Sequence, residues 1–208
     1  MSPAVYALII ANVIAYGLMH LFGQAAIDLF ALWPYGEFPI RGGGSVGFAP
    51  WQLVTYAFLH DPDNIVHIAL NLYALYAFGG EVERTLGTRR FVWVYGASVI
   101  AAGLCQLIVV TLAKSSGIAP TLGASGGVFG VLLAFGLLFP HRRVMLIIPP
   151  IPMPAWVLVT LYAAMELANG VFRSNTGIAH FAHLGGMIGA FIALSAFGYK
   201  RFQDTRRG

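Results

Sequence analysis

Six long apolar stretches alternate with short polar connections along the chain, and each comes close to the ~20 residues that cross a bilayer as a helix. They lie near residues 3–23, 64–82, 91–113, 122–139, 155–172 and 179–198. The first stretch lacks the basic leader of a signal peptide, so we expect it to be retained. The pattern predicts an all-α membrane protein, a polytopic bundle of six transmembrane helices.

The segment 24–50 interrupts this pattern. Its prolines and glycines exclude a spanning helix but leave aromatic and apolar side chains. They lie in Trp33-Pro34-Tyr35-Gly36, at Pro39 and in Gly42-Gly43-Gly44-Ser45. We therefore expect a loop that lies on the membrane interface or dips into it.

Composition agrees with this fold class. Of the 208 residues, 58% are hydrophobic and only 10% are charged, against roughly 25% charged in a soluble domain. The net charge of +4 comes without any basic run longer than two residues, so no nucleic-acid partner is expected. Cys105 is the one cysteine, which excludes an intrachain disulfide and a metal site built from cysteines.

The basic residues predict the orientation. With the N-terminus in the cytoplasm, nine Lys and Arg residues lie inside and three outside, as the positive-inside rule favours. The nine are Arg84, Arg89, Arg90, Arg142, Arg143, Lys200, Arg201, Arg206 and Arg207, and the three are Arg41, Lys114 and Arg173. Both termini are then cytoplasmic.

Ser125, His183 and His67 fall at a similar depth on three different predicted helices. Each lies 16 or 17 residues before the polar residue that ends its helix on the cytoplasmic side. At ~1.5 Å per residue this places all three several ångströms below the outer surface of a core about 30 Å thick. Isolated polar side chains at that depth are costly unless they face the bundle interior or a water-filled cavity, and by default they mark function.

Ser125 lies among small residues, in Thr121-Leu122-Gly123-Ala124-Ser125-Gly126-Gly127-Val128-Phe129-Gly130. Glycines allow another backbone or a substrate to approach, and a helix that starts here would aim its unpaired N–H groups at the surroundings of the hydroxyl, a plausible oxyanion environment. The alternative is packing between membrane helices, because Gly126 and Gly130 also match the small-xxx-small pattern.

A serine nucleophile needs a base within hydrogen-bond reach and donors for the developing oxyanion. His183 can be that base. His67 and Asn71 lie four residues apart on one helix face and can offer an imidazole and an amide N–H to one point, although Asn71 alone can equally be a helix-packing residue. No acidic residue is obviously placed to orient His183, so a Ser–His dyad is favoured over a triad. Glu166, 17 residues earlier, is interpreted as a buried hydrogen-bonding residue.

Short motifs distributed from about residue 50 to 190 carry a resemblance. They are Pro50-Trp51-Gln52, Phe58-Leu59-His60, His67-Ile68-Ala69-Leu70-Asn71, Gly79-Gly80-Glu81-Val82-Glu83-Arg84-Thr85-Leu86-Gly87, Gly123-Ala124-Ser125-Gly126 and Ala182-His183-Leu184-Gly185-Gly186. In this order and in spans of this orientation they resemble the rhomboid family of intramembrane serine proteases. The resemblance implies a single rhomboid-like domain over 1–208, with six spans as in the basic bacterial form.

The resemblance also implies roles. Ser125 is then the nucleophile, His183 the general base and acid, and His67 and Asn71 contribute to the oxyanion hole with the Ser125 backbone N–H. The substrates are transmembrane proteins in the lipid bilayer, and the active site opens to the outer face of a bacterial inner (cell) membrane. No cofactor or metal is required, and no His/Glu/Asp group has an evident zinc spacing.

The chain departs from the family pattern at several positions. Phe129 stands where the family often has a tyrosine packed on the catalytic histidine. The family's Trp-Arg pair in the first loop has no clear counterpart, because Trp33 is followed by Pro34. His180 could compete with His183 as the base, but the Gly-Gly that follows His183 favours His183. His60 is interpreted as interfacial or structural.

Two other classes of function remain as alternatives. One is a catalytically inactive rhomboid-like binder of transmembrane segments, although relatives of that kind characteristically lack the serine or the histidine. The other is a transporter, which the absence of an internal repeat and of paired broken helices disfavours.

Overall fold

The computed structural model describes residues 2–40, 43–113, 119–145, 150–172 and 179–199. Its helices are α1 Pro3–Phe22, α2 Gln24–Phe30, α3 Gln52–Thr55, η1 Tyr56–Phe58, α4 Ile65–Ala74, η2 Leu75–Gly79, α5 Gly80–Leu86, α6 Thr88–Ala113, α7 Ser125–Leu138, α8 Ala155–Phe172 and α9 His180–Ala196. Two short antiparallel pairs accompany them, β1 Phe38–Pro39 with β2 Ser45–Val46 and β3 Arg143–Met145 with β4 Pro152–Pro154. The all-α, polytopic membrane fold class is confirmed.

Each predicted span corresponds to helix, but not all of the helices have the predicted length. Four are long and apolar enough to cross a membrane: α1, the run Ile65–Leu86 that joins α4 to α5 through the π-helix η2, α6, and α8. In contrast, α7 has 14 residues and α9 has 17. At ~1.5 Å per residue, α7 is only about 21 Å long, which is shorter than a core of about 30 Å.

The start of α7 is delayed because the residues before it pair with another segment. Thr121 and Leu32 exchange two backbone hydrogen bonds of 2.9 Å, and the Gly123 N–H donates to the Tyr56 carbonyl at 3.0 Å. An extended backbone that is already hydrogen-bonded to a neighbour has no need to become helical. The predicted span at 122–139 is therefore too long at its first end.

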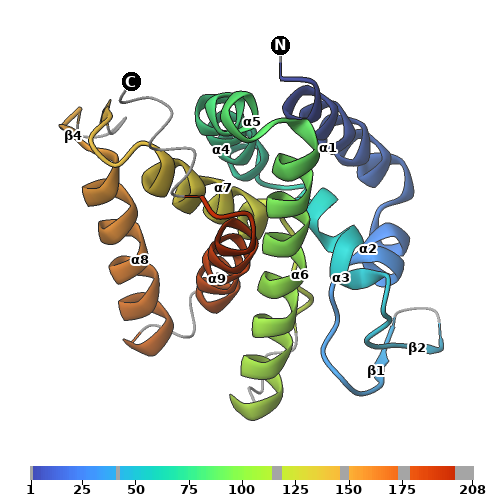
Figure 1. The fold of residues 1–208 in the computed structure, drawn as a ribbon. Helices are drawn as coiled ribbons and strands as arrows, with labels where there is room; N and C mark the ends of the chain where they lie inside the picture. The colour runs from blue at the N-terminus through green and yellow to red at the C-terminus, as the bar shows by residue number, and fades with distance from the viewer. Residues whose placement is uncertain (1, 41–42, 114–118, 146–149, 173–178, 200–208) are drawn as a thin grey trace.

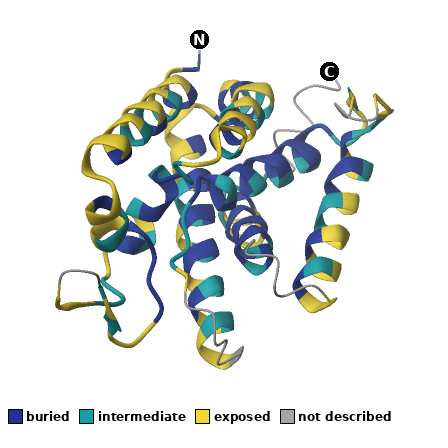
Figure 2. Ribbon diagram, turned by 180° about the vertical axis from the view of Figure 1, so that it is seen from behind, coloured by how far each residue is buried: buried dark blue, intermediate teal, exposed yellow. Residues whose placement is uncertain are grey.

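α7 and α9 lie against α6 in the middle of the bundle, while α1 and α8 lie at opposite edges (Figure 1). The start of α1, the end of α9, the junction of α5 with α6, and the β3–β4 pair gather at one end. This end also carries the described arginines among the residues predicted to be cytoplasmic. Figure 2 shows α7 mostly buried, whereas α1 exposes a broad outer face. That face is apolar and suits lipid, with Tyr6, Ile10, Val13, Ile14, Leu18 and Leu21 all at least 45% exposed.

Small residues bring the three central helices together. A Cβ at Gly126 would lie 2.5 Å from that of Ala102 on α6, and one at Gly186 would collide with the backbone of Gly126. A Cβ at Gly130 would collide with the Ser98 side chain. The helix-packing interpretation of Gly126 and Gly130 is thus correct. It holds alongside a role for Ser125, whose hydroxyl contacts the His183 side chain on α9.

Segment 24–50 contains no spanning helix, as expected, but it is more than a loop. It holds α2 and the β1–β2 pair, and Trp33 is buried at 7% exposure. The side chain of Gln52 holds two points of this segment together, because it accepts hydrogen bonds from the Trp33 and Ala49 N–H groups, both at 3.2 Å. Backbone hydrogen bonds to Leu32 of this segment, and to Tyr56 of η1 shortly after it, hold the chain that leads into α7.

At the end of the bundle that carries the termini, Glu83 joins three helices. Its carboxylate, 1% exposed, accepts from the Ala4 N–H at 3.0 Å, from the Val5 N–H at 2.9 Å and from the Thr88 hydroxyl at 2.8 Å. It thereby satisfies first-turn donors of α1 and ties α5 to the start of α6.

Candidate active site

Ser125 is the first residue of α7, and a glycine makes the turn before it. Gly123 has φ of 129°, a conformation that side chains rarely adopt, and a Cβ there would lie 3.0 Å from Nε2 of His67. The backbone N–H groups of the first helical turn have no partner within a helix, so they remain available around the Ser125 hydroxyl. Ser125 therefore lies at a helix N-terminus, as the small-residue motif predicted.

His183 is in hydrogen-bond contact with Ser125. Its Nε2 lies 2.8 Å from the Ser125 Oγ, and the imidazole is 8% exposed. The Phe129 ring stacks on this imidazole with centroids 4.2 Å apart and planes at 7°. Phe129 follows Ser125 by one helical turn, so a single face of α7 supplies both the hydroxyl and the stacking ring, as the resemblance implied.

His67 also faces this site, from α4. The position that a Cβ of Gly123 would take is 3.0 Å from the His67 Nε2 and 3.7 Å from the Ser125 Oγ, so the two side chains flank one point. Asn71, 6% exposed, donates one amide hydrogen to the His67 carbonyl at 2.9 Å. Its amide has a second donor, but no hydrogen bond joins Asn71 to Ser125 within the described residues.

His60 is fully buried, and its ring packs edge-on against that of His67 with centroids 5.2 Å apart. Burial, with a further contribution from the nearby His67, lowers the pKa of His60 to about 4. A neutral His60 therefore backs the His67 ring at physiological pH. This burial agrees with a structural role for His60, and its position at the membrane interface stays a prediction.

The expectation that no carboxylate is placed near His183 is wrong. The Oε2 of Glu166, on α8, lies 2.9 Å from the Nδ1 of His183 and 2.7 Å from the Nδ1 of His180. These three side chains also offer ligand atoms within 4.8 Å of one another, so the expectation that no His/Glu group has metal-binding spacing fails here as well. His180 is the first residue of α9, and its ring is buried at 6% exposure and hydrogen-bonded to Glu166.

A signal for Glu166 was present in the sequence. Glu166 lies six residues before the end of α8, and His183 lies three residues after the start of α9. Residues at similar distances from the turn of a helical hairpin become neighbours, so a separation of 17 along the chain says little about distance in space.

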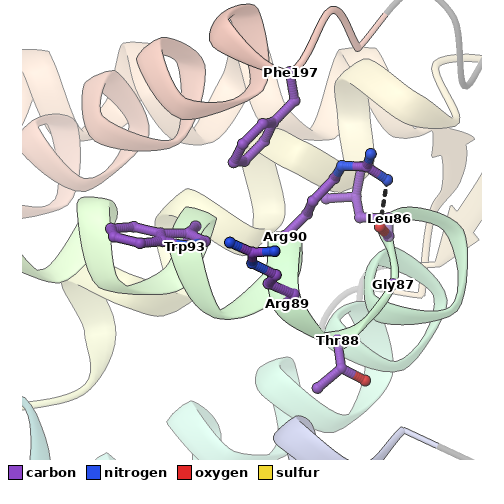
Figure 3. A pocket seen from close by; sticks show the side chains of 7 residues that line it. All are labelled: Leu86, Gly87, Thr88, Arg89, Arg90, Trp93 and Phe197. Carbon is purple, nitrogen blue, oxygen red and sulfur yellow. Dashed lines mark hydrogen bonds between the residues drawn. The ribbon is translucent and has the colours of Figure 1, made fainter.

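A cavity of about 550 Å³ lies elsewhere and shares no residue with this site. It is lined by Leu86, Gly87, Thr88, Arg89, Arg90, Trp93 and Phe197. Figure 3 shows these side chains around the start of α6, with Phe197 approaching from the segment that follows α9. None of them is a serine or histidine, so the cavity lacks the Ser–His pairing seen at Ser125.

Comparison with known proteins gives a consistent result. The sequence profile of the Rhomboid domain family matches residues 47–200, which is most of the chain. Among similar proteins, Rhomboid protein 1, mitochondrial, of Saccharomyces cerevisiae is 36% identical over 135 residues, covering 65% of this chain and 38% of the yeast protein.

Two bacterial proteins are similar to the same region. Rhomboid protease GluP of Bacillus subtilis is 31% identical over 148 residues, covering 71% of this chain and 26% of that protein. Rhomboid protease GlpG of Salmonella choleraesuis is 28% identical over 134 residues, covering 64% and 42%. The chain therefore matches well under half the length of each of these relatives.

Proposed function

The chain belongs to the rhomboid family, and we propose that it is an intramembrane serine endopeptidase that cleaves transmembrane proteins in or beside their membrane segments. One observation carries the proposal: the Ser125 hydroxyl and the His183 Nε2 lie 2.8 Å apart at the N-terminus of a buried helix. The similarity to proteins named as rhomboid proteases supports it.

The chemistry follows from this pair. His183 Nε2 takes the Ser125 hydroxyl proton while Oγ attacks the scissile carbonyl carbon, which gives a tetrahedral oxyanion. His183 then gives that proton to the leaving amine nitrogen, the C–N bond breaks, and an acyl ester remains on Ser125. Water, deprotonated by His183, attacks the ester, and the returning proton restores the hydroxyl as the carboxylic acid product leaves.

Oxyanion stabilisation falls to groups on two helices. The Ser125 backbone N–H lies in the first turn of α7, whose dipole favours negative charge at this end. His67 flanks the same point beside Gly123, and Asn71 contributes its free amide hydrogen one turn away on α4. Donors fixed in a buried site need little reorganisation as charge develops, which makes them effective.

The substrate class follows from the medium. A transmembrane helix in lipid satisfies all its backbone hydrogen bonds, so its scissile bond must unwind before Ser125 can attack. We expect cleavage next to Gly, Ser or Pro, which weaken the helix. The predicted orientation, with both termini cytoplasmic, places Ser125 toward the outer surface of a cell membrane.

The test is cleavage of a generic transmembrane substrate by the purified protein in detergent. The wild type should cut it and Ser125→Ala should not, with an unchanged melting temperature. Normal cleavage by a folded Ser125→Ala variant would refute the nucleophile, and no cleavage by either protein across several substrates would favour the inactive binder of transmembrane segments.

A further inference from the structure

The catalytic histidine has a buried acidic neighbour that the proposed dyad does not use. Glu166 is 6% exposed, and its Oε2 lies 2.9 Å from Nδ1 of His183, on the side of the ring opposite to Ser125. We propose that Glu166 is a positioning residue for His183, and that His180 holds Glu166 in place for this role. The inference rests on the proposed protease function.

Hydrogen-bond chemistry selects one tautomer of His183. An ionised carboxylate only accepts hydrogen bonds, so with Glu166 ionised the nitrogen that faces Oε2 carries the hydrogen. A neutral His183 with its hydrogen on Nδ1 leaves a lone pair on Nε2, the atom 2.8 Å from the Ser125 hydroxyl. That tautomer can take the serine proton and the other cannot.

Charge gives Glu166 a second role. When His183 takes the serine proton it becomes an imidazolium at a site that is 8% exposed, and a buried charge is costly unless it is paired. A carboxylate at 2.9 Å supplies the partner without accepting the proton. The N–H of His183 Nδ1 points poorly at this carboxylate, since Nδ1 has no well-formed hydrogen bond in the described part of the chain. The contact is thus chiefly electrostatic.

His180 explains why Glu166 stays within reach. Its Nδ1 lies 2.7 Å from the same Oε2, and the two histidine rings cross at 89° with centroids 6.5 Å apart. One oxygen is therefore fixed between two imidazoles on successive turns of α9. The Glu166 carboxylate then links α8 to α9, the helix that carries His183. In this proposal, α8 contributes to the reaction through His183 and not through contact with the substrate.

Metal binding by these three residues is the competing interpretation, and the distances disfavour it. Ligand atoms around a tetrahedral zinc ion lie about 3.3 Å apart, because each is ~2.0–2.2 Å from the metal. The two Nδ1–Oε2 distances, 2.7 Å for His180 and 2.9 Å for His183, are both shorter than this spacing, and the first is a hydrogen bond.

The first measurement needs no variant. Nitrogen-15 NMR of histidine-labelled wild-type protein in detergent, at neutral pH, should show His183 protonated on Nδ1 and unprotonated on Nε2, with the signal assigned by its loss in His183→Ala. A His183 with its hydrogen on Nε2 overturns the proposal.

The second measurement is kinetic. Glu166→Gln keeps the shape but removes the charge, and its amide can satisfy either tautomer. We expect kcat to fall on the order of 10²-fold with KM nearly unchanged. This is less than the ~10⁴-fold that follows loss of tautomer control in a soluble triad, because the contact here is poorly aligned. Glu166→Asp should recover part of the loss, and His180→Phe should lower kcat by less than Glu166→Gln.

Glu83→Gln is the matched control, because it makes the same change at a carboxylate that is 1% exposed and contacts no site residue. Its kcat should stay near that of the wild type. If Glu166→Gln is as active as wild type while Ser125→Ala is inactive, the positioning role is wrong and the protease assignment stands. Tightly bound metal that Glu166→Gln removes, with activity lost to a chelator, also overturns the role.

Discussion

Two glutamates, Glu83 and Glu166, are both almost fully buried inside helices, yet their surroundings differ in kind. Glu83 faces two backbone N–H groups and a hydroxyl, none of which changes its protonation near neutral pH. Glu166 faces two imidazoles, whose ring nitrogens can each donate or accept a proton. The comparison teaches that the partners of a buried carboxylate, more than its burial, separate a structural clamp from a group able to assist proton transfer.

The largest effect should come from removing Ser125 or His183, the pair that Glu166 is proposed to support. Ser125→Ala and His183→Ala should each abolish measurable cleavage, and the double variant should cost little more, because residues that act as one unit are not additive. Melting temperatures should stay close to the wild-type value. Turnover assays in detergent test this, and two single losses that multiply in the double variant would show that the residues act independently.

Next in size are the oxyanion donors. His67→Ala and Asn71→Ala should each lower kcat more than they raise KM, by up to ~10²–10³-fold, since other donors or water cover part of the loss. Ser125 should still react with a fluorophosphonate, but more slowly, whereas His183→Ala should not be labelled at all. If His67→Ala alone prevents labelling, the base has been assigned to the wrong helix.

On the structural side, Glu83→Ala should lower stability without changing catalysis. It leaves the Ala4 and Val5 N–H groups and the Thr88 hydroxyl without their acceptor, at a cost of about 2–4 kcal/mol in the free energy of unfolding. Thermal unfolding in detergent measures this, with kcat of the surviving folded fraction expected within twofold. A large fall in kcat at unchanged melting temperature would mean that Glu83 also assists catalysis, and the contrast with Glu166 would be wrong.

The smallest effect concerns the ring stacked on His183. Phe129→Leu should lower kcat by roughly three- to tenfold, since an aromatic pair contributes about 0.5–1.5 kcal/mol. Phe129→Tyr keeps the ring and should remain within about threefold of the wild type. Parallel assays at saturating substrate decide this, and equal activity of Phe129→Leu would mean that the stacking at 4.2 Å does not orient the imidazole.

The sequence was sufficient to pair Ser125 with His183 but not to identify their neighbours. Counting residues back from charged helix ends put Ser125 and His183 at one depth, because helical rise is regular and charges mark the membrane surface. The same reasoning predicted too early a start for α7, since the hydrogen bonds that Thr121 makes with Leu32 depend on a segment almost 90 residues away. Periodicity within one stretch carries no information about such pairing.

Glu166 was underestimated for a related reason. Its helix and that of His183 form a hairpin, but which face of α8 turns toward α9 is set by packing, and the surrounding residues 161–170 are apolar almost throughout. With lipid on one side and protein on the other, both faces of such a helix look alike in the sequence. The carboxylate itself was the best indication of the inward face.

The order of the two reacting residues along the chain has a consequence for biosynthesis. The proposed nucleophile, Ser125, lies on α7 and the proposed base, His183, lies on α9, 58 residues later. The backbone before Ser125 is hydrogen-bonded to Leu32 and Tyr56, which come much earlier in the chain. A nascent chain that has inserted everything up to α8 holds a serine without a base. Under the proposed function, the protein therefore stays inert while it emerges from the ribosome and gains the capacity to cut neighbouring proteins only when α9 docks.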